Sequence, residues 1–141
     1  MAEFIMKDLV YKNNRKEDFF ISSSATSYEE IGNRVHEGTI RKLAEAGISP
    51  IGKTAEKFRK CDYDAYDLII GMDDNNIKNI IRIIGDDRDG KVYKLLDFCG
   101  GGSVADPWYT GDFDKTYDDI FAGCLGLFKK CNNSVFIKKH L

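Results

Sequence analysis

Residues 67–84, with the sequence DLIIGMDDNNIKNIIRII, decide the fold class because a strand and a helix follow each other directly. Residues 67–72 are a continuous apolar run between polar neighbours, which is typical of a strand buried on both faces of a parallel sheet. Asp73 or Asp74 can cap a helix that follows at about residues 74–84. A buried strand leading into a helix predicts an α/β fold.

The same alternation of helices and strands extends on both sides of this unit. The sequence predicts further helices at residues 1–13, 35–46, 53–60 and 113 to about 130, and further strands at 19–22 and 92–98. Gly47 is suited to end the second helix, Thr54 to begin the third, and residues 86–90 to form a turn. We therefore expect a parallel sheet with helices on both faces.

The composition restricts the function classes. The chain has 141 residues, 43% of them hydrophobic and 31% charged, with a net charge of −2. This is the size of one domain, which we expect at residues 1–130, with a C-terminal tail at 131–141. The weak net charge does not favour nucleic acid as a partner. No apolar run approaches the roughly 20 residues that span a bilayer, so no membrane partner is expected.

The cysteines give two negative results. Cys61, Cys99, Cys124 and Cys131 form no C-x-x-C pair, and with only two histidines a zinc site is not expected. Reduced thiols in a cytoplasmic protein are the simpler interpretation. None of the four cysteines begins a C-x5-R segment.

Four segments carry a resemblance to a known family: MAE at 1–3, SSSATSYEEIGN at 22–33, YDAYDLIIGMDDNNIKNI at 63–80 and DPWYTGDFDKTYDDI at 106–120. In this order and spacing they resemble the low-molecular-weight protein tyrosine phosphatases. The resemblance implies a three-layer α/β/α fold with a four-stranded parallel sheet of order 2-1-3-4. It implies no cofactor and no metal.

The family's chemistry needs a C-x5-R-[ST] phosphate loop between the first strand and the first helix. In that chemistry the cysteine thiolate attacks phosphorus, the arginine holds the equatorial oxygens, and an aspartic acid protonates the leaving oxygen. This sequence begins one residue after the place where that loop should end. We expect an N-terminally truncated form of an active enzyme, lacking the first strand, the nucleophile and the arginine. The alternative is a natural variant without catalytic power.

The resemblance assigns roles to residues of the DPWY segment. Asp106 matches the general acid and base, although an aspartate before Pro107 is also common in turns. Trp108 and Tyr109 would form the wall of the pocket and stack on a phosphorylated aromatic ring. Ordinary partly buried aromatic residues are the alternative for this pair.

Residues of the SSSATSYEEIGN segment have supporting roles in the resemblance. Ser23 would support the phosphate loop and Asn33 would brace neighbouring loops, although both also suit strand ends or turns. Tyr28 or Glu29 would face the substrate, and the sequence does not distinguish between them.

Two classes of function follow. The first is a phosphatase for phosphotyrosine proteins or small aryl phosphates, inactive in the 141-residue chain itself. The second is a non-catalytic oligomerising or interaction module. An arsenate reductase would need redox cysteines near the site, which the cysteine spacing does not support.

The absent first strand would leave an open position in the sheet. We expect it to be filled by SVFI at 134–137 or by an element of a second copy in a homo-oligomer. A frayed tail is the alternative.

Overall fold

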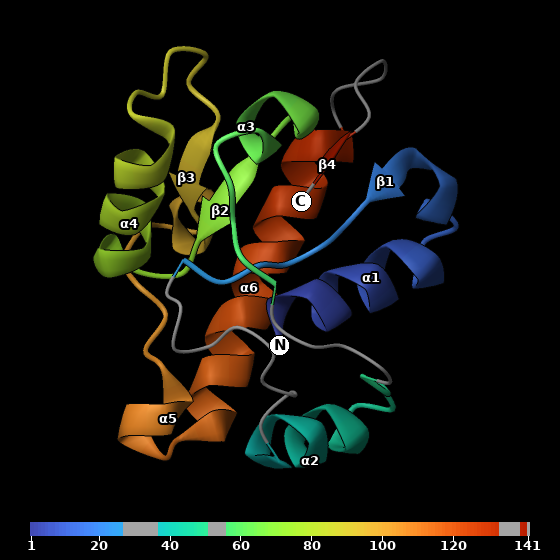
Figure 1. Cartoon of the computed structure of the whole chain (residues 1–141). Coiled ribbons are helices and arrows are strands. Elements are labelled where there is room, and N and C mark those ends of the chain that lie inside the picture. Colours follow the sequence, from blue (N-terminus) through green and yellow to red (C-terminus); the bar gives the residue numbers. More distant parts are fainter. Residues whose placement is uncertain (27–36, 51–55, 133–138, 141) are drawn as a thin grey trace.

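The computed structural model describes residues 1–26, 37–50, 56–132 and 139–140. Its helices and strands follow the alternation expected from the sequence (Figure 1). In chain order they are α1 (Ala2–Lys12), η1 (Lys16–Asp18), β1 (Phe19–Phe20), α2 (Glu37–Glu45), α3 (Asp62–Ala65), β2 (Ile69–Gly71), α4 (Asp74–Ile84), β3 (Val92–Lys94), η3 (Leu95–Phe98), α5 (Pro107–Thr110), α6 (Phe113–Asn132) and β4 (Lys139–His140).

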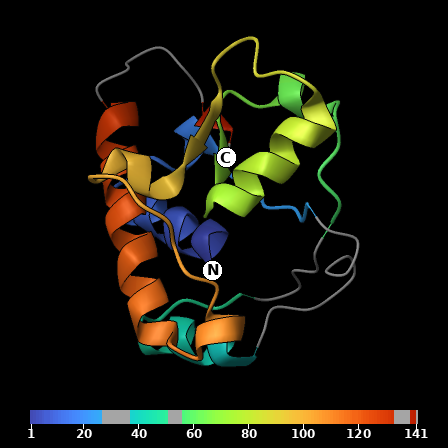
Figure 2. The same cartoon turned by 90° about the vertical axis from the view of Figure 1, so that its left-hand side faces the viewer.

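The strands form a middle layer between helices. β2 and β3 pair in parallel, with Ile69 opposite Val92. α4 lies on one face of this pair, and α1 and α6 lie on the other (Figures 1 and 2). Successive residues of β2 serve the two faces: Ile69 packs in the cluster of α4, whereas Ile70 contacts the larger core of α1 and α6. The α/β fold is therefore confirmed.

The strand–helix unit at 67–84 has the expected geometry. Asp73 caps α4 by accepting a hydrogen bond from the Asn76 backbone N–H at 2.7 Å. The Asn76 side chain in turn accepts from the Met72 N–H at 2.9 Å, which ties the end of β2 to the first turn of the helix. At the other end, Gly85 has φ +87° and its N–H donates to the Ile81 carbonyl. Capping residues at both ends thus set the bounds of α4.

Residues 92–98 are not one continuous strand as predicted. The strand stops at Lys94, and η3 follows as a 3-10 helix. Leu95 and Leu96 are both buried, at 2% and 8% exposure, and both pack in the larger core of α1 and α6, whereas consecutive residues of a strand point to opposite faces of the sheet. The turn brings both leucines into the core. Gly126 makes this packing possible, because a Cβ there would lie 2.1 Å from the Phe98 carbonyl oxygen.

The helix predicted at 53–60 is wrong for its described part. Lys57 forms an isolated parallel bridge with Ala25, whose N–H donates to the Glu56 carbonyl at 2.6 Å. The Phe58 N–H donates back to the Ala25 carbonyl at 2.8 Å, and the Phe58 side chain is buried. Extended pairing with the segment after β1 replaces the helix. Thr54 lies outside the described residues.

The last helix, expected to end at about residue 130, continues slightly further. α6 continues through Asn132, and Cys131 is buried in the larger core at 3% exposure. β4 then pairs in parallel with β1, with Phe19 opposite Lys139 and Phe20 opposite His140. Residues 134–137, predicted to fill the open strand position, lie outside the described residues. None of the described helices is long and apolar enough to cross a membrane.

Candidate active site

Asp106 is held at the carboxyl end of β2 by the residues that precede it. The Val104 N–H donates to the carbonyl of Met72, the residue after β2, at 2.8 Å. The Thr116 hydroxyl of α6 donates to the Ala105 carbonyl at 3.0 Å, and Thr116 is itself buried at 3% exposure. The backbone before Asp106 is therefore fixed to both the sheet and α6. In α/β folds this end of the strands is where ligands bind.

A third attachment comes from Lys94 at the end of β3. Its ammonium lies 2.9 Å from a carboxylate oxygen of Asp74 and donates to the Ser103 hydroxyl at 3.3 Å. The hydrogen bond to Asp74 raises the pKa of Lys94, partly opposed by burial, so the side chain remains a cation. Lys94 thus links α4 to the loop that leads to Asp106.

The polypeptide after Asp106 is a short helix instead of an irregular loop. The Asp106 carbonyl accepts from the N–H groups of Tyr109 at 3.1 Å and Thr110 at 3.3 Å. Pro107 occupies the first position of α5, where its missing N–H is not needed. Asp106 itself is exposed to solvent. An accessible carboxylate on a backbone attached at several points can meet a ligand without losing its position.

The two predicted wall residues lie on α5. Tyr109 is 84% exposed, so its ring is available to a ligand. The backbone of Trp108 belongs to the same helix, but its side chain lies outside the described part of the structure. The structure therefore places Asp106 and Tyr109 within one turn of each other.

Ser23 contacts the start of α1. Its hydroxyl donates to a carboxylate oxygen of Glu3 at 2.6 Å, and the Lys7 ammonium lies 2.6 Å from the other carboxylate oxygen. Glu3 is 7% exposed, an unusual burial for a charged residue, and both its oxygens are engaged. Ser23 therefore joins the chain after β1 to the first turn of α1. Tyr28, Glu29 and Asn33 lie outside the described residues.

Three contact residues were given no role by the sequence reasoning. Glu3 and Thr116 lie in segments that carry the family resemblance and Lys94 lies in a predicted strand, but the sequence does not show that their side chains hold the segments around the candidate site. A glutamate in the first turn of a helix is ordinary for the helix dipole. Only the contacts at Ser23 show why Glu3 is buried.

The cysteines do not provide a nucleophile at this site. Cys124 and Cys131 are buried in the larger core, and burial raises the pKa of the Cys124 thiol to about 12. Cys61 and Cys99 are exposed, at the start of α3 and the end of η3. In the described residues no group of three or more His, Cys, Asp or Glu side chains is arranged to hold a metal ion.

The chain matches known proteins over most of its length. Residues 1–136 match the family model described as low molecular weight phosphotyrosine protein phosphatase. The low molecular weight protein-tyrosine-phosphatase YfkJ of Bacillus subtilis is 35% identical over 127 residues, which cover 88% of this chain and 81% of YfkJ. PtpA of Staphylococcus aureus, with the same description, is 33% identical over 129 residues, covering 90% of this chain and 81% of PtpA.

Solved structures agree with the sequence matches. The crystal structure of YfkJ from Bacillus subtilis superposes with a TM-score of 0.90 at 32% identity, covering 94% of this chain and 86% of that one. SP-PTP, a low molecular weight protein tyrosine phosphatase from Streptococcus pyogenes, gives a TM-score of 0.80 at 36% identity, covering 92% of this chain and 81% of that one.

Proposed function

Since the chain belongs to the low molecular weight phosphotyrosine protein phosphatase family, we propose that its domain hydrolyses phosphotyrosine in proteins, or small aryl phosphates, when a C-x5-R phosphate loop precedes Met1. We also propose that the 141-residue chain alone does not turn over phosphate esters, because none of its cysteines begins such a segment. The domain without the loop is a scaffold that carries the general acid.

Asp106 is the proton donor in this proposal. The cysteine of the loop attacks phosphorus while Asp106 gives its proton to the departing phenolic oxygen, leaving a phosphocysteine and a neutral phenol. Asp106, now a carboxylate, takes a proton from the water that attacks the phosphocysteine, and phosphate and the thiolate are released. The exposed carboxylate on a segment attached to β2 and α6 is the observation that carries this role.

The remaining site residues have supporting roles. Trp108 and Tyr109 flank the substrate ring, and Tyr28 or Glu29 borders the pocket from the other loop. Ser23 supports the phosphate loop and is itself held by its hydrogen bond to Glu3 at the start of α1, and Asn33 braces neighbouring loops. The reaction needs no metal and no cofactor, because the thiolate, the arginine and Asp106 supply its nucleophile, anion clamp and acid.

The proposal is tested with a fused chain, in which an apolar strand and a C-x5-R-S-P loop are added ahead of Met1. Turnover of p-nitrophenyl phosphate in the presence of EDTA is measured for the fused chain and for the 141-residue chain. We expect turnover from the fused chain only, and its loss when the added cysteine becomes serine. Turnover by the unfused chain that disappears in Asp106→Ala would contradict the proposal.

The second candidate is a non-catalytic interaction module, which the absence of a C-x5-R segment favours. The same fused chain separates the two functions. A well-folded fused chain that binds phosphate or an aryl phosphate without turning it over would favour the module.

A further inference from the structure

α2 packs against the start of α6, which directly follows the candidate site. α5 ends at Thr110 and α6 begins at Phe113, so only two residues separate the helix after Asp106 from α6. Figures 1 and 2 show α2 at the end of the molecule where α5 and the start of α6 lie. α2 is therefore placed to influence the position of the segment that carries Asp106.

The first turn of α6 holds the Asp106 segment from both sides. Before Asp106, the Thr116 hydroxyl donates to the Ala105 carbonyl at 3.0 Å. After it, the Asp112 N–H donates to the Thr110 hydroxyl at 3.1 Å, and the Asp112 carboxylate accepts a backbone N–H from the first turn of α6. A displacement of this turn would therefore move both ends of the segment together.

Phe113 supplies the apolar part of the contact with α2. Its ring lies against Gly38, in the first turn of α2, where a Cβ would come within 2.4 Å of the ring carbon Cζ. This separation is shorter than a van der Waals contact, so the space holds no side chain at position 38. The backbone of α2 and the first residue of α6 are therefore in direct contact.

Lys42 supplies the charged part of the contact. Its ammonium lies 2.7 Å from a carboxylate oxygen of Asp114 and 5.4 Å from the centre of the Tyr117 ring, both in α6. It also lies 3.1 Å from a carboxylate oxygen of Glu45. The hydrogen bonds to Asp114 and Glu45 raise the pKa of Lys42, and burial opposes this rise only in part, so the side chain is a cation at neutral pH.

The Lys42–Asp114 pair differs from an ordinary surface pair such as Lys12–Asp8. Lys12 and Asp8 join neighbouring turns of the same helix, and the Lys12 side chain is 63% exposed. The Lys42 side chain is 19% exposed, and its partner belongs to a different helix. An exposed pair within one helix contributes little to stability, whereas a pair between two helices also restricts how they move relative to each other.

We propose that Lys42 is a positioning residue for Asp106. Through Asp114 it holds the first turn of α6 on α2, and this turn keeps the segment around Asp106 in place. The consequence for proton transfer rests on the proposed function of Asp106. Lys42 does not touch the reacting atoms in this proposal, so it affects the step that needs the acid and leaves phosphate binding unchanged.

Amide hydrogen exchange in the 141-residue chain, followed by NMR, tests whether Lys42 holds the segment. The reporters are the amides of residues 109–111, which donate to the carbonyls of Asp106 and Pro107. Lys42→Met keeps an unbranched side chain and removes its charge, and Lys42→Arg keeps the charge. Lys12→Met is the matched control, because it removes a lysine pair on another helix.

Lys42→Met should speed the exchange of the three amides about threefold to fivefold, because an ion pair near the surface contributes a small but measurable local stability. Lys42→Arg and Lys12→Met should leave the exchange rates within about twofold. Asp114→Asn should reproduce the effect of Lys42→Met, and combining the two should add nothing further, since both remove the same contact. Asp114 is 80% exposed, so Asp114→Asn provides the comparison should Lys42→Met fail to fold.

Kinetics of the fused chain test the consequence for proton transfer. Lys42→Met should lower kcat for phenyl phosphate about threefold to fivefold, and lower it less for p-nitrophenyl phosphate, whose leaving group needs the acid less. Inhibition by inorganic phosphate should be unchanged. In Asp106→Asn the same change should have no further effect, because the acid that Lys42 positions is gone.

Unchanged amide exchange in Lys42→Met and Asp114→Asn would overturn the proposal, as would an equal effect of the Lys12→Met control. A loss of turnover that is the same for both substrates, or that persists in Asp106→Asn, would also overturn it, since Lys42 would then act through another part of the molecule. A fused chain without turnover, combined with the expected amide exchange, would reject the proposed function and still support the hold of Lys42 on the segment.

Discussion

Asp87 and Asp106 are both loop aspartates, but their surroundings differ. Asp87 lies in the turn before β3, and Asp106 lies immediately before α5. Asp87 accepts hydrogen bonds from the Tyr63 hydroxyl at 2.7 Å and from the backbone N–H of Lys91 at 2.8 Å. Asp106 is exposed, and the backbone of the two residues before it is hydrogen-bonded to Met72, at the end of β2, and to Thr116 of α6. The first carboxylate holds the fold together, and the second is presented to solvent.

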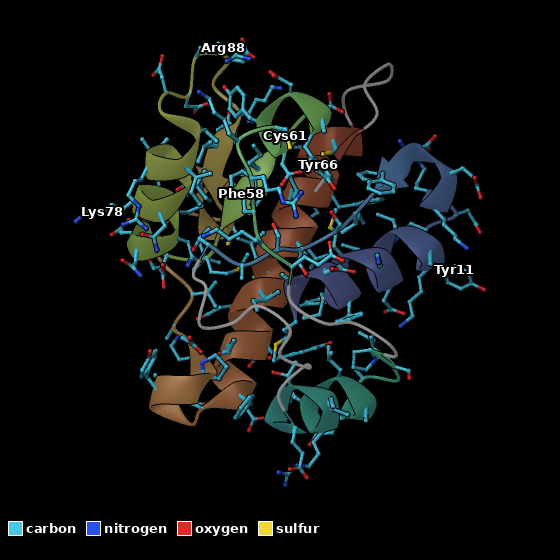
Figure 3. The ribbon with its side chains drawn as sticks, in the orientation of Figure 1. Tyr11, Phe58, Cys61, Tyr66, Lys78 and Arg88 are labelled. Atoms are coloured by element: carbon cyan, nitrogen blue, oxygen red, sulfur yellow. The ribbon has the colours of Figure 1, made fainter. Side chains whose placement is uncertain are left out.

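The surroundings of Tyr63 explain the first case. Tyr63 is 2% exposed, its hydroxyl accepts from the Asp89 N–H at 2.8 Å, and Lys91 donates to its carbonyl at 2.8 Å. The guanidinium of Arg88, at the outer end of the molecule in Figure 3, lies 5.1 Å from its ring centroid. All these contacts join α3 to the turn. The comparison teaches that the carboxylate of Asp87 is enclosed by donors from two segments of the fold, whereas the carboxylate of Asp106 is accessible, as the proton transfer proposed for it requires.

The largest effect should come from Asp106→Asn in the fused chain that carries the C-x5-R loop. Turnover should fall by roughly 10²–10⁴-fold, because the amide cannot give a proton to the leaving oxygen. The free energy of unfolding should change by no more than about 0.5 kcal/mol, since the side chain is exposed. Steady-state kinetics and urea unfolding check the two values. A loss of turnover that is explained by a loss of folded protein would show that Asp106, like Asp87, has a structural role.

The reverse effect is expected for Asp87→Ala. This change leaves the Tyr63 hydroxyl and the Lys91 N–H without their acceptor, and it should lower the free energy of unfolding by about 1–3 kcal/mol. Turnover per folded molecule of the fused chain should stay within about twofold. Urea unfolding monitored by circular dichroism measures the first value, and Asp86→Ala, at the preceding residue of the same turn, is the control. A tenfold loss of turnover in folded Asp87→Ala would contradict the structural role.

Asp87 should also make the stability of the chain depend on pH. Burial opposes ionisation of Asp87, but the hydrogen bonds from Tyr63 and from the backbone outweigh it and hold the pKa of Asp87 below its usual range. A lowered pKa in the folded state gives stability that is present above the unfolded pKa of about 3.9 and is lost as pH falls through the folded value. The wild-type chain should therefore lose more stability than Asp87→Asn between about pH 5 and about pH 3. Urea unfolding midpoints of both chains are measured at each pH. If Asp87 did not ionise in the folded state, the wild-type chain would not lose more stability than Asp87→Asn as the pH falls.

The smallest effect is expected from modification of the cysteine thiols. Two cysteines are exposed and two are buried, so their reactivities can be compared within one molecule. The thiolate is the reactive form, and burial raises the pKa of Cys124 to about 12. A disulfide reagent at neutral pH should label Cys61 and Cys99 in the folded chain and reach Cys124 only on unfolding. Mass spectrometry of the labelled peptides provides the test. Rapid labelling of Cys124 in the native chain would contradict the packing of α6.

The sequence predicted well those features that local residues determine. The apolar run of β2, the cap at Asp73 and the glycine after α4 each act within a few residues, so their structure is readable from spacing. η3 was missed because its packing depends on two glycines of α6 about thirty positions away: a Cβ at Gly123 would lie 2.5 Å from Leu95 Cγ, and a Cβ at Gly126 would lie 2.1 Å from the Phe98 carbonyl oxygen. The extended segment at 56–58 was missed for the same reason, since its partner is Ala25.

The candidate site divides in the same way. Asp106, Trp108 and Tyr109 were identified from one short segment, and the structure describes how that segment begins α5. The residues that hold it could not be identified, because Met72, Thr116 and Lys94 reach it from three separate elements. Contacts between distant segments are the part of a site that the sequence does not display.

The most direct test of the account compares Asp106→Asn with the unaltered fused chain on two substrates, p-nitrophenyl phosphate and phenyl phosphate. A nitrophenolate leaves easily without a proton, whereas phenolate needs one, so an acid matters more for the second substrate. The account predicts that the substitution lowers kcat/KM for phenyl phosphate at least about tenfold more than for p-nitrophenyl phosphate. An equal loss on both substrates would contradict the assignment of Asp106 as the proton donor.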